Sequence, residues 1–363
     1  MIIVEKRKKY SVKENIIIIL VSIFLSLLIS SLIFSIRGIN PFFALYKIIF
    51  SSFGSNYGIK ETITKAIPLM LCGIGLSIAF KGKFWNIGAE GQLLTGAVLA
   101  TWIGLFIGKN LPGIVLIPLM FLVGFFGGGL IGLIPAFLKV RFNINEVIIT
   151  LMLNYIVEQY VQYLVYGPWK GKSQYGFPYT DNLSQNALLP VIKGSRIHYP
   201  TLIIAIFLSF LIYFLISKTK LGYEIRVIGE NPLSAKYAGI DFMKVTLIMM
   251  FLSGGIAALA GVGEISGIHK HLTYPSQISS GYGYTAIIVA WLAQLNPIIV
   301  ILTSLFFGGI LVGGDVIQTS FGFPFATINV FNGLMLVFIS ISYFLIQYKI
   351  TFKGIKKWMK QLF

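Results

Sequence analysis

Long runs of apolar residues recur along the whole chain, and they restrict its fold more than any other feature. A bilayer core about 30 Å thick needs roughly 20 apolar residues per helix, because backbone groups cannot stay unpaired in hydrocarbon. Ten candidate spans follow: 16–36, 66–80, 87–107, 113–138, 144–166, 199–216, 245–263, 282–295, 298–312 and 325–346. The expected fold is an all-α polytopic membrane protein with about ten transmembrane helices.

Two neighbouring candidates, 282–295 and 298–312, are short and are separated only by Asn296 and Pro297, so they could also form one kinked helix. Lys and Arg near span ends accumulate on the cytoplasmic side of a membrane. Ten spans put both termini inside, together with nineteen of the 29 Lys and Arg residues, whereas merging the pair would move the basic C-terminal segment outside. We therefore expect ten spans and two cytoplasmic termini.

Composition excludes several classes of protein. Hydrophobic residues make up 56% and charged residues 11% of the chain, far from the roughly 25% charge of soluble domains, which argues against a soluble enzyme. The net charge of +17 follows the span topology, so it does not indicate nucleic-acid binding. Cys72 is the single cysteine, and His198, His269 and His271 are expected at the surface of outside loops. No metal site, no catalytic residue and no ATP-hydrolysing loop is expected in this chain.

Glycines spaced four residues apart predict close helix packing. Gly124, Gly128 and Gly132 form such a row inside one candidate span. Small residues at this spacing let helix backbones approach closely in a membrane. The chain should therefore fold as a packed bundle.

Polar residues recur every four positions in the span 144–166: Glu146, Thr150, Asn154, Glu158 and Gln162. This spacing places them on one slowly drifting helix face. An ionisable group in a membrane needs a partner or a wet cavity, so the face either lines a translocation path or bonds neighbouring helices. Glu146 lies in the first turn, where its charge suits the helix dipole.

The segment 84–92 opens another span with small residues and with the polar residues Asn86, Glu90 and Gln92. Glu90 either polarises a wet cavity or bonds backbone groups freed by an irregular turn. Aromatic residues such as Trp85 could stack on a base, or could simply pack at an interface. The candidate path residues are Asn86, Glu90, Gln92, Asn154, Tyr155, Glu158, Tyr282 and Tyr284.

Two connections are long enough to carry functions of their own. The extracytoplasmic loop covers 167–198, and the cytoplasmic loop covers 217–244. In the cytoplasmic loop Asn231 reads as an N-cap, Pro232 as a first helical residue and Gly239 as a stop signal, which predicts about two helical turns. Such a helix either transmits force from a soluble partner or is a capped surface turn.

Four motifs together resemble the permease of a bacterial ABC importer, in particular the simple-sugar and nucleoside branch. They are Asn86-Ile87-Gly88-Ala89-Glu90-Gly91-Gln92, Asn145-Glu146-Val147-Ile148 leading to Leu151-Met152-Leu153-Asn154-Tyr155, Gly229-Glu230-Asn231-Pro232 leading to Ala235-Lys236-Tyr237-Ala238-Gly239-Ile240, and Gly281-Tyr282-Gly283-Tyr284-Thr285-Ala286-Ile287. Their order is fairly specific, and the general pattern covers nearly all of the chain. Gln294 and Asn332 depart from the pattern and bear on the identity of the cargo.

The resemblance implies one permease domain over 1–363 in the bacterial inner membrane, giving an alternating-access path. It implies a second permease subunit, a cytoplasmic ABC ATPase that holds ATP and Mg, and an extracytoplasmic substrate-binding lipoprotein; this chain binds no cofactor. The residues expected to couple to the ATPase are Gly229, Glu230, Asn231, Pro232, Ala235, Tyr237, Ala238 and Gly239.

Nucleosides are the first cargo that the resemblance implies, with riboflavin or a simple sugar as alternatives. From other classes, an ion-coupled secondary transporter would need ion sites such as Glu90 and Glu158 together with an internal repeat, and no clear duplication of the two halves is visible in the sequence. A membrane scaffold that transports nothing and an intramembrane enzyme are the remaining alternatives.

Overall fold

The computed structural model describes residues 2–6, 38–108, 110–322 and 348–352, with single residues between 21 and 35 and between 330 and 345. The chain divides into two compact units, Ser52–Val312 and the combination of Met1–Ser51 with Gly313–Phe363. The first and last expected spans, 16–36 and 325–346, lie largely outside the described residues, and so does Asn332.

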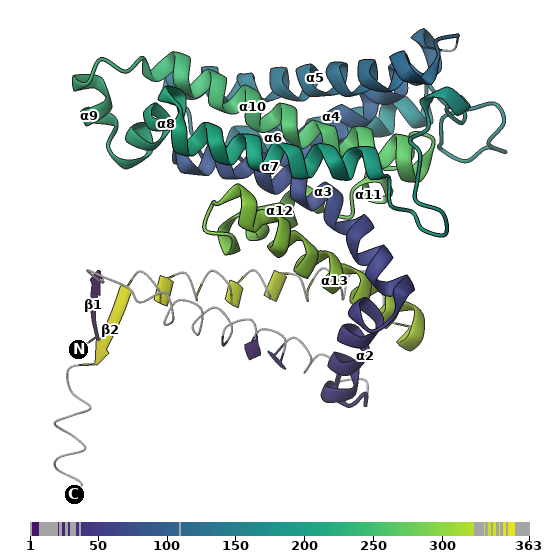
Figure 1. The fold of residues 1–363 in the computed structure, drawn as a ribbon, viewed down its shortest axis with the longest axis horizontal. Coiled ribbons are helices and arrows are strands. Elements are labelled where there is room, and N and C mark those ends of the chain that lie inside the picture. The colour runs from purple at the N-terminus through teal and green to yellow at the C-terminus, as the bar shows by residue number, and fades with distance from the viewer. Residues whose placement is uncertain are drawn as a thin grey trace, which may run out of the picture. The chain divides into compact units, whose positions relative to one another are not determined.

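The unit Ser52–Val312 is a helical bundle whose elements are labelled in Figure 1. Its elements are α3 (Asn56–Lys81), α4 (Ala89–Trp102) with a π-helical turn (Ile103–Ile107), α5 (Gly113–Phe142), α6 (Glu146–Tyr166), a 3-10 turn (Gln185–Ala187), α7 (Tyr199–Lys218), α8 (Lys220–Glu230), α9 (Pro232–Tyr237), α10 (Phe242–Gly263) with a π-helical turn (Glu264–His269), α11 (Pro275–Ile278) and α12 (Tyr282–Leu292). Two further helices, α2 (Pro41–Phe53) and α13 (Pro297–Phe321), cross the boundary between the units.

Six described helices are long and apolar enough to cross a membrane: Asn56–Lys81, Ala89–Ile107, Gly113–Phe142, Tyr199–Lys218, Phe242–His269 and Pro297–Phe321. Each coincides with an expected span, although α3 begins ten residues before the expected position 66. The expected span 144–166 is also a helix, α6, but its recurring polar residues keep it out of this set. The expected total of ten is not confirmed.

The expected spans 282–295 and 298–312 are two separate helices. Gln294 and Leu295 adopt left-handed backbone conformations with φ of 52° and 56°, which ends α12 and reverses the chain before Pro297. The Thr303 hydroxyl of α13 donates to the Val289 carbonyl of α12 at 3.1 Å. The pair is therefore a helical hairpin, and the alternative of one kinked helix is wrong.

The helix α12 has 11 residues, which at about 1.5 Å per residue covers only half of a bilayer core. It is preceded by residues 270–281, an irregular stretch that contains the short helix α11 and buries Thr273, Ile278 and Ser279. Irregular backbone is tolerated at membrane depth only where protein surrounds it or it lines a cavity. Because the half before α12 is not helical, the apolar run at 282–295 is too short for a complete span.

The expected glycine row mediates the packing of α5 on α10. A Cβ atom on Gly124 would clash with Val262, one on Gly128 with Ala258 and one on Gly132 with the Met250 carbonyl. The helix α10 also packs against α3 and α4. The prediction of close packing through these glycines is confirmed.

The second unit contains the two described strands. β1 (Ile2–Lys6) pairs antiparallel with β2 (Tyr348–Phe352), with Ile2 opposite Phe352 and Lys6 opposite Tyr348. The same unit packs Gly313 against Ile48 and places the Lys47 ammonium 4.9 Å from the centre of the Phe321 ring. This strand pair is a feature that the apolar runs did not predict.

Candidate functional site

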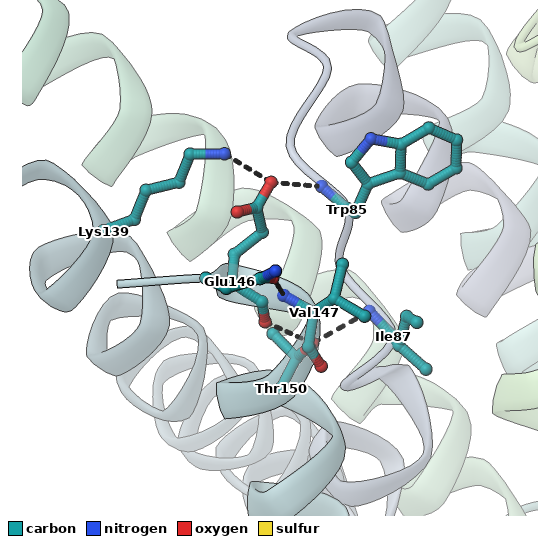
Figure 2. Close-up of polar contacts among 7 residues, drawn as sticks. Trp85, Ile87, Lys139, Glu146, Val147 and Thr150 are labelled. Atoms are coloured by element: carbon teal, nitrogen blue, oxygen red, sulfur yellow. Dashed lines mark hydrogen bonds and ion pairs between the residues drawn. The ribbon is translucent and has the colours of Figure 1, made fainter. Parts of the chain in front are cut away.

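Polar side chains of the bundle meet around residues 84–92, the segment that leads into α4. At one end Glu146, the first residue of α6, forms an ion pair with Lys139 near the end of α5. Figure 2 shows both side chains pointing toward one another, with the Trp85 backbone nitrogen beside the same carboxylate oxygen at 3.5 Å. The Lys139 ammonium also lies 5.0 Å from the centre of the Phe84 ring.

A tight turn brings these two helices together. Asn143 ends α5 in a left-handed conformation with φ of 53°, and Asn145 then caps α6 by accepting a hydrogen bond from the Val147 nitrogen at 2.9 Å. Lys139 and Glu146 are only seven positions apart in the sequence. The buried Glu146 carboxylate therefore has a charged partner and a position in the first helical turn. The polar face of α6 was expected either to line a translocation path or to bond neighbouring helices, and Glu146 fits the second alternative.

Two further residues of the polar face hold the same segment. The Thr150 hydroxyl accepts a hydrogen bond from the Ile87 nitrogen at 3.2 Å. Asn154 accepts from the Gly91 nitrogen at 2.9 Å, and its amide donates to the Ile87 carbonyl at 2.9 Å and to the Tyr284 hydroxyl at 3.1 Å. Asn154 thus joins α4, α6 and α12 through one buried side chain.

The amides of Asn86 and Gln92 form a second buried group. The Asn86 amide nitrogen donates to the Gln92 side-chain oxygen and to the Ser253 hydroxyl of α10, both at 3.1 Å. The Asn86 oxygen accepts from the Gly88 nitrogen at 2.9 Å. Backbone groups in an irregular turn have no helical hydrogen-bond partners, and the Asn86 side chain supplies one for the Gly88 nitrogen. Asn86 and Gln92 therefore support the structure of the segment.

Glu90 lies where the N-termini of two helices converge. It is in the first turn of α4, and its carboxylate accepts a hydrogen bond at 2.7 Å from the Gly283 nitrogen in the first turn of α12. A Cβ atom on Gly283 would clash with the Glu90 backbone. Unpaired N–H groups and the helix dipole at each N-terminus stabilise a carboxylate. Glu90 was expected either to polarise a wet cavity or to bond backbone groups that lack a helical partner. The observed geometry matches the second alternative.

The outward face of α6 is exposed, whereas the residues of the polar network are buried. Tyr155, Gln159, Tyr160 and Tyr163 are exposed and Glu158 is half-buried, with the Tyr163 side chain 64% exposed. The exposed positions of α6 also include Ile148, Met152 and Ile156, so polar and apolar side chains share its outward face. On α7 the exposed positions between 203 and 214 are all apolar or aromatic. Hydrocarbon suits the α7 face, whereas a carboxylate and an amide on α6 need water or protein beside them.

The expected path residues divide by how far they are buried. Asn86, Glu90, Gln92, Asn154 and Tyr282 are buried within the chain, Tyr284 and Glu158 are half-buried, and Tyr155 is exposed. The structure joins Asn86 with Gln92, and Asn154 with Tyr284. Within this chain, Tyr155 and Glu158 are the two that lie on an open face.

The loop 217–244, which is expected on the cytoplasmic side, folds as its local signals predict. Asn231 ends α8 and caps α9, accepting hydrogen bonds from the nitrogens of Leu233 and Ser234 at 3.0 and 3.2 Å. Gly239 follows with φ of +70°. Tyr237 is 92% and Leu233 68% exposed, whereas Ala235 is completely buried. The exposed pair is available to a partner, and Ala235 packs inside the chain.

A group of charged residues near the opposite end of the bundle was not identified from the sequence. Glu264 is buried in the π-helical turn after α10, with its carboxylate 3.8 Å from His269 Nε2. Arg196 and Glu61 form an ion pair at 3.2 Å. The expected span stopped at 263, and the apolar residues Ile265 and Ile268 beyond it were the available signal.

The histidines also differ from expectation. His198 is completely buried just before α7, and its ring lies against Gly263 and Gly267, so its expected surface position is wrong. Burial lowers the pKa of His198 to about 4. Among the described residues no group of three His, Cys, Asp or Glu side chains could hold a metal ion.

Long apolar helices around a buried polar network, with a half-length helix that follows buried irregular backbone, define an integral membrane protein of the transport class. Residues 58–340 match the model of the family described as the permease component of branched-chain amino acid transport systems. The chain belongs to this permease family.

Its relatives include permeases of ABC transporters with different named cargoes. The chain is 33% identical over 307 residues to a glucose ABC transporter permease protein of Haloferax volcanii, covering 82% of this chain and 79% of the relative. It is 29% identical over 332 residues to a guanosine ABC transporter permease protein of Bacillus subtilis, covering 91% and 94%. It is 28% identical over 342 residues to a nucleoside ABC transporter permease protein of Lactococcus lactis, covering 91% and 92%.

Proposed function

We propose that this chain is one membrane-spanning half of an ATP-driven importer for nucleosides, with the translocation path along the outward face of α6. The observation that carries this proposal is that exposed Tyr155 and half-buried Glu158 lie three positions apart on α6, a helix of the membrane bundle. Lipid would leave the Glu158 carboxylate without a partner. A water-filled path between two permease subunits supplies both water and a second protein surface.

The proposed assembly contains a second permease subunit that faces α6, a cytoplasmic ABC ATPase and an extracytoplasmic substrate-binding lipoprotein. The exposed Leu233 and Tyr237 of α9 would contact the ATPase, which binds ATP and Mg. This chain itself has no catalytic role. It lies in the bacterial inner membrane as one permease domain of about ten spans, with both termini in the cytoplasm.

The proposed cargo follows from the relatives and from the aromatic side chains on the path face. Tyr160 and Tyr163 stack with ring centres 6.4 Å apart, and a nucleobase can stack on exposed rings of this kind. The guanosine and nucleoside permeases align with 91% of this chain. Glucose is the second candidate, because the Haloferax volcanii relative is a glucose permease with 33% identity.

The test is uptake of labelled guanosine into proteoliposomes that contain this chain, its partner permease, its ATPase and its binding protein. ATP-dependent uptake that excess glucose or ribose does not reduce would support the nucleoside proposal. ATP-dependent uptake of glucose instead would support the ATP-driven importer but with glucose, not a nucleoside, as its cargo. Uptake that follows an ion gradient and does not need ATP would contradict the proposal.

A further inference from the structure

The Lys139–Glu146 ion pair lies between the cytoplasmic loop and the segment that leads into α4. A cavity of about 170 Å³ separates the loop from the bundle, and its lining includes Lys83, Phe84, Lys139, Gly229 and Glu230. Lys139 therefore borders the cavity on one side and bonds Glu146 on the other. Lys139 thus lies between the loop and the buried network.

The loop itself is pressed against the bundle beside the cavity. A Cβ atom on Gly229 would clash with the Lys81 carbonyl at the end of α3. Ile228, which is buried, and Pro232 line the cavity from the loop side. A displacement of α8 and α9 toward the membrane would push on Lys81 through Gly229, because closely packed backbone cannot absorb it. The push would reach Lys139 through Phe84, whose ring centre lies 5.0 Å from the Lys139 ammonium.

On the other side of the ion pair, the first two turns of α6 hold the entry into α4. Glu146 accepts a hydrogen bond from the Trp85 nitrogen and Thr150 accepts one from the Ile87 nitrogen. Figure 2 shows these two contacts one turn apart on the same helix. A rotation or shift of α6 would therefore be transferred directly to residues 85–87, and from there to Glu90 and α12.

We propose that Lys139 and Glu146 form a positioning latch that transmits movement of the α8–α9 loop to α6 and to the start of α4. The inference rests on the proposed function, since it assigns the loop to contact with an ATPase. The latch makes no contact with cargo. It fixes α6, whose outward face is the proposed path, relative to the element that an ATPase would move.

A charged pair suits this role because its two partners depend on each other. Glu146 is 7% exposed, and removing one partner of a buried pair leaves an uncompensated charge. Removing both charges at once leaves no such charge, so a double variant can fold without the latch. The double variant Lys139→Met with Glu146→Gln therefore separates coupling from folding.

The test uses the complete reconstituted complex and measures solute transported per ATP hydrolysed. For the double variant we expect this ratio to fall about tenfold, which equals about 1.4 kcal/mol of coupling free energy, while ATP hydrolysis continues. Lys139→Arg keeps the ion pair and should retain most of the coupling. The matched control removes the ion pair of Arg196 with Glu61, which lies outside the α8–α9 loop, with Arg196→Met and Glu61→Gln, since the Glu61 side chain is 11% exposed and that of Glu146 is 10% exposed; its ratio should not change.

The outcomes separate the latch from the proposed function. Coupled, ATP-dependent uptake by the unmodified complex and an equal ratio in the double variant would overturn the latch alone. A complex that takes up no solute with ATP in its unmodified form would overturn the proposed function and the latch with it. If the double variant loses assembly, the ratio is measured for Glu146→Asp alone, which keeps both charges but draws the carboxylate away from Lys139; an unchanged ratio there would also overturn the latch.

Discussion

The Asn154 side chain of α6 donates a hydrogen bond to the Tyr284 hydroxyl of α12 at 3.1 Å, across 130 positions of sequence. The same amide group donates to the Ile87 carbonyl, and the Asn154 oxygen accepts from the Gly91 nitrogen. One buried residue thus connects the proposed path helix with the half-length helix and with the irregular entry into α4.

Replacing Asn154 with Ala should destabilise the chain. The Gly91 nitrogen and the Ile87 carbonyl would lose their side-chain partner in a buried site, which costs about 2 to 4 kcal/mol. Thermal unfolding of the purified chain in detergent should show a lowered midpoint. The matched control is Gln159→Ala, on the exposed face of the same helix, and an equal loss of stability in both variants would contradict the structural role of Asn154.

Tyr155→Ala and Glu158→Gln should have the opposite signature, with transport impaired and stability retained. Both side chains lie toward the open face of α6, so their removal changes the surface that cargo would meet. We expect uptake by the reconstituted complex to fall by roughly tenfold, the equivalent of one good contact. Ile203→Ala on the apolar face of α7 is the control, and if it reduces uptake as much, the α6 face is not the path.

Gly283→Ala should disrupt the meeting of α4 and α12. The added methyl group would overlap the Glu90 backbone, and overpacking of this kind typically costs about 1 to 3 kcal/mol. The variant should unfold at a lower temperature than the unmodified chain. Leu130→Ala on α5 is the comparison, since Leu130 is exposed and its loss leaves no buried clash. Equal midpoints for Gly283→Ala and the unmodified chain would show that the two helix starts have room to separate.

The contribution of His198 to the stability of the folded chain should fall as the pH drops from about 6.5 toward 4. Burial lowers the pKa of His198 to about 4 in the folded chain, whereas an unfolded histidine has a pKa near 6.5. Between these values His198 binds more protons in the unfolded state, so its contribution to stability rises with pH there and is constant above it. The comparison is thermal unfolding at several pH values for the unmodified chain and for His198→Phe.

The His198→Phe variant removes this histidine's part of the pH dependence and leaves that of other acidic and basic groups in place. The expected difference between the two chains grows by about 2 to 3 kcal/mol on acidification, given the displaced pKa. Parallel stability curves for the two chains would show that His198 does not titrate differently on folding.

The α9 residues should divide into partner contacts and internal packing. Tyr237→Ser and Leu233→Ser remove exposed side chains, so we expect weaker coupling of ATP hydrolysis to uptake with an unchanged unfolding midpoint. Ala235→Phe should lower the midpoint instead, because Ala235 is completely buried within the chain and a larger side chain overpacks the site. A lowered midpoint for Tyr237→Ser would assign Tyr237 to internal packing.

Local chemistry made several features predictable from sequence. The long apolar runs located the six described spans, because hydrocarbon demands an apolar helix of a certain length. Asn231, Pro232 and Gly239 placed α9, since capping depends only on residues adjacent in the chain. The row Gly124, Gly128 and Gly132 predicted close packing, although only the structure identified α10 as the neighbour.

The tertiary structure decided which residues meet. Spacing placed Glu146, Thr150, Asn154 and Glu158 on one face of α6, but periodicity does not state which part of a drifting face turns inward; the first three are buried and Glu158 is half-buried. Glu90 and Gly283 are 193 positions apart, and the burial of residues 270–281 depends on the helices that surround them. The sequence by itself therefore determined a membrane permease and its local helix signals, while long-range packing determined which polar residues join helices and which face outward.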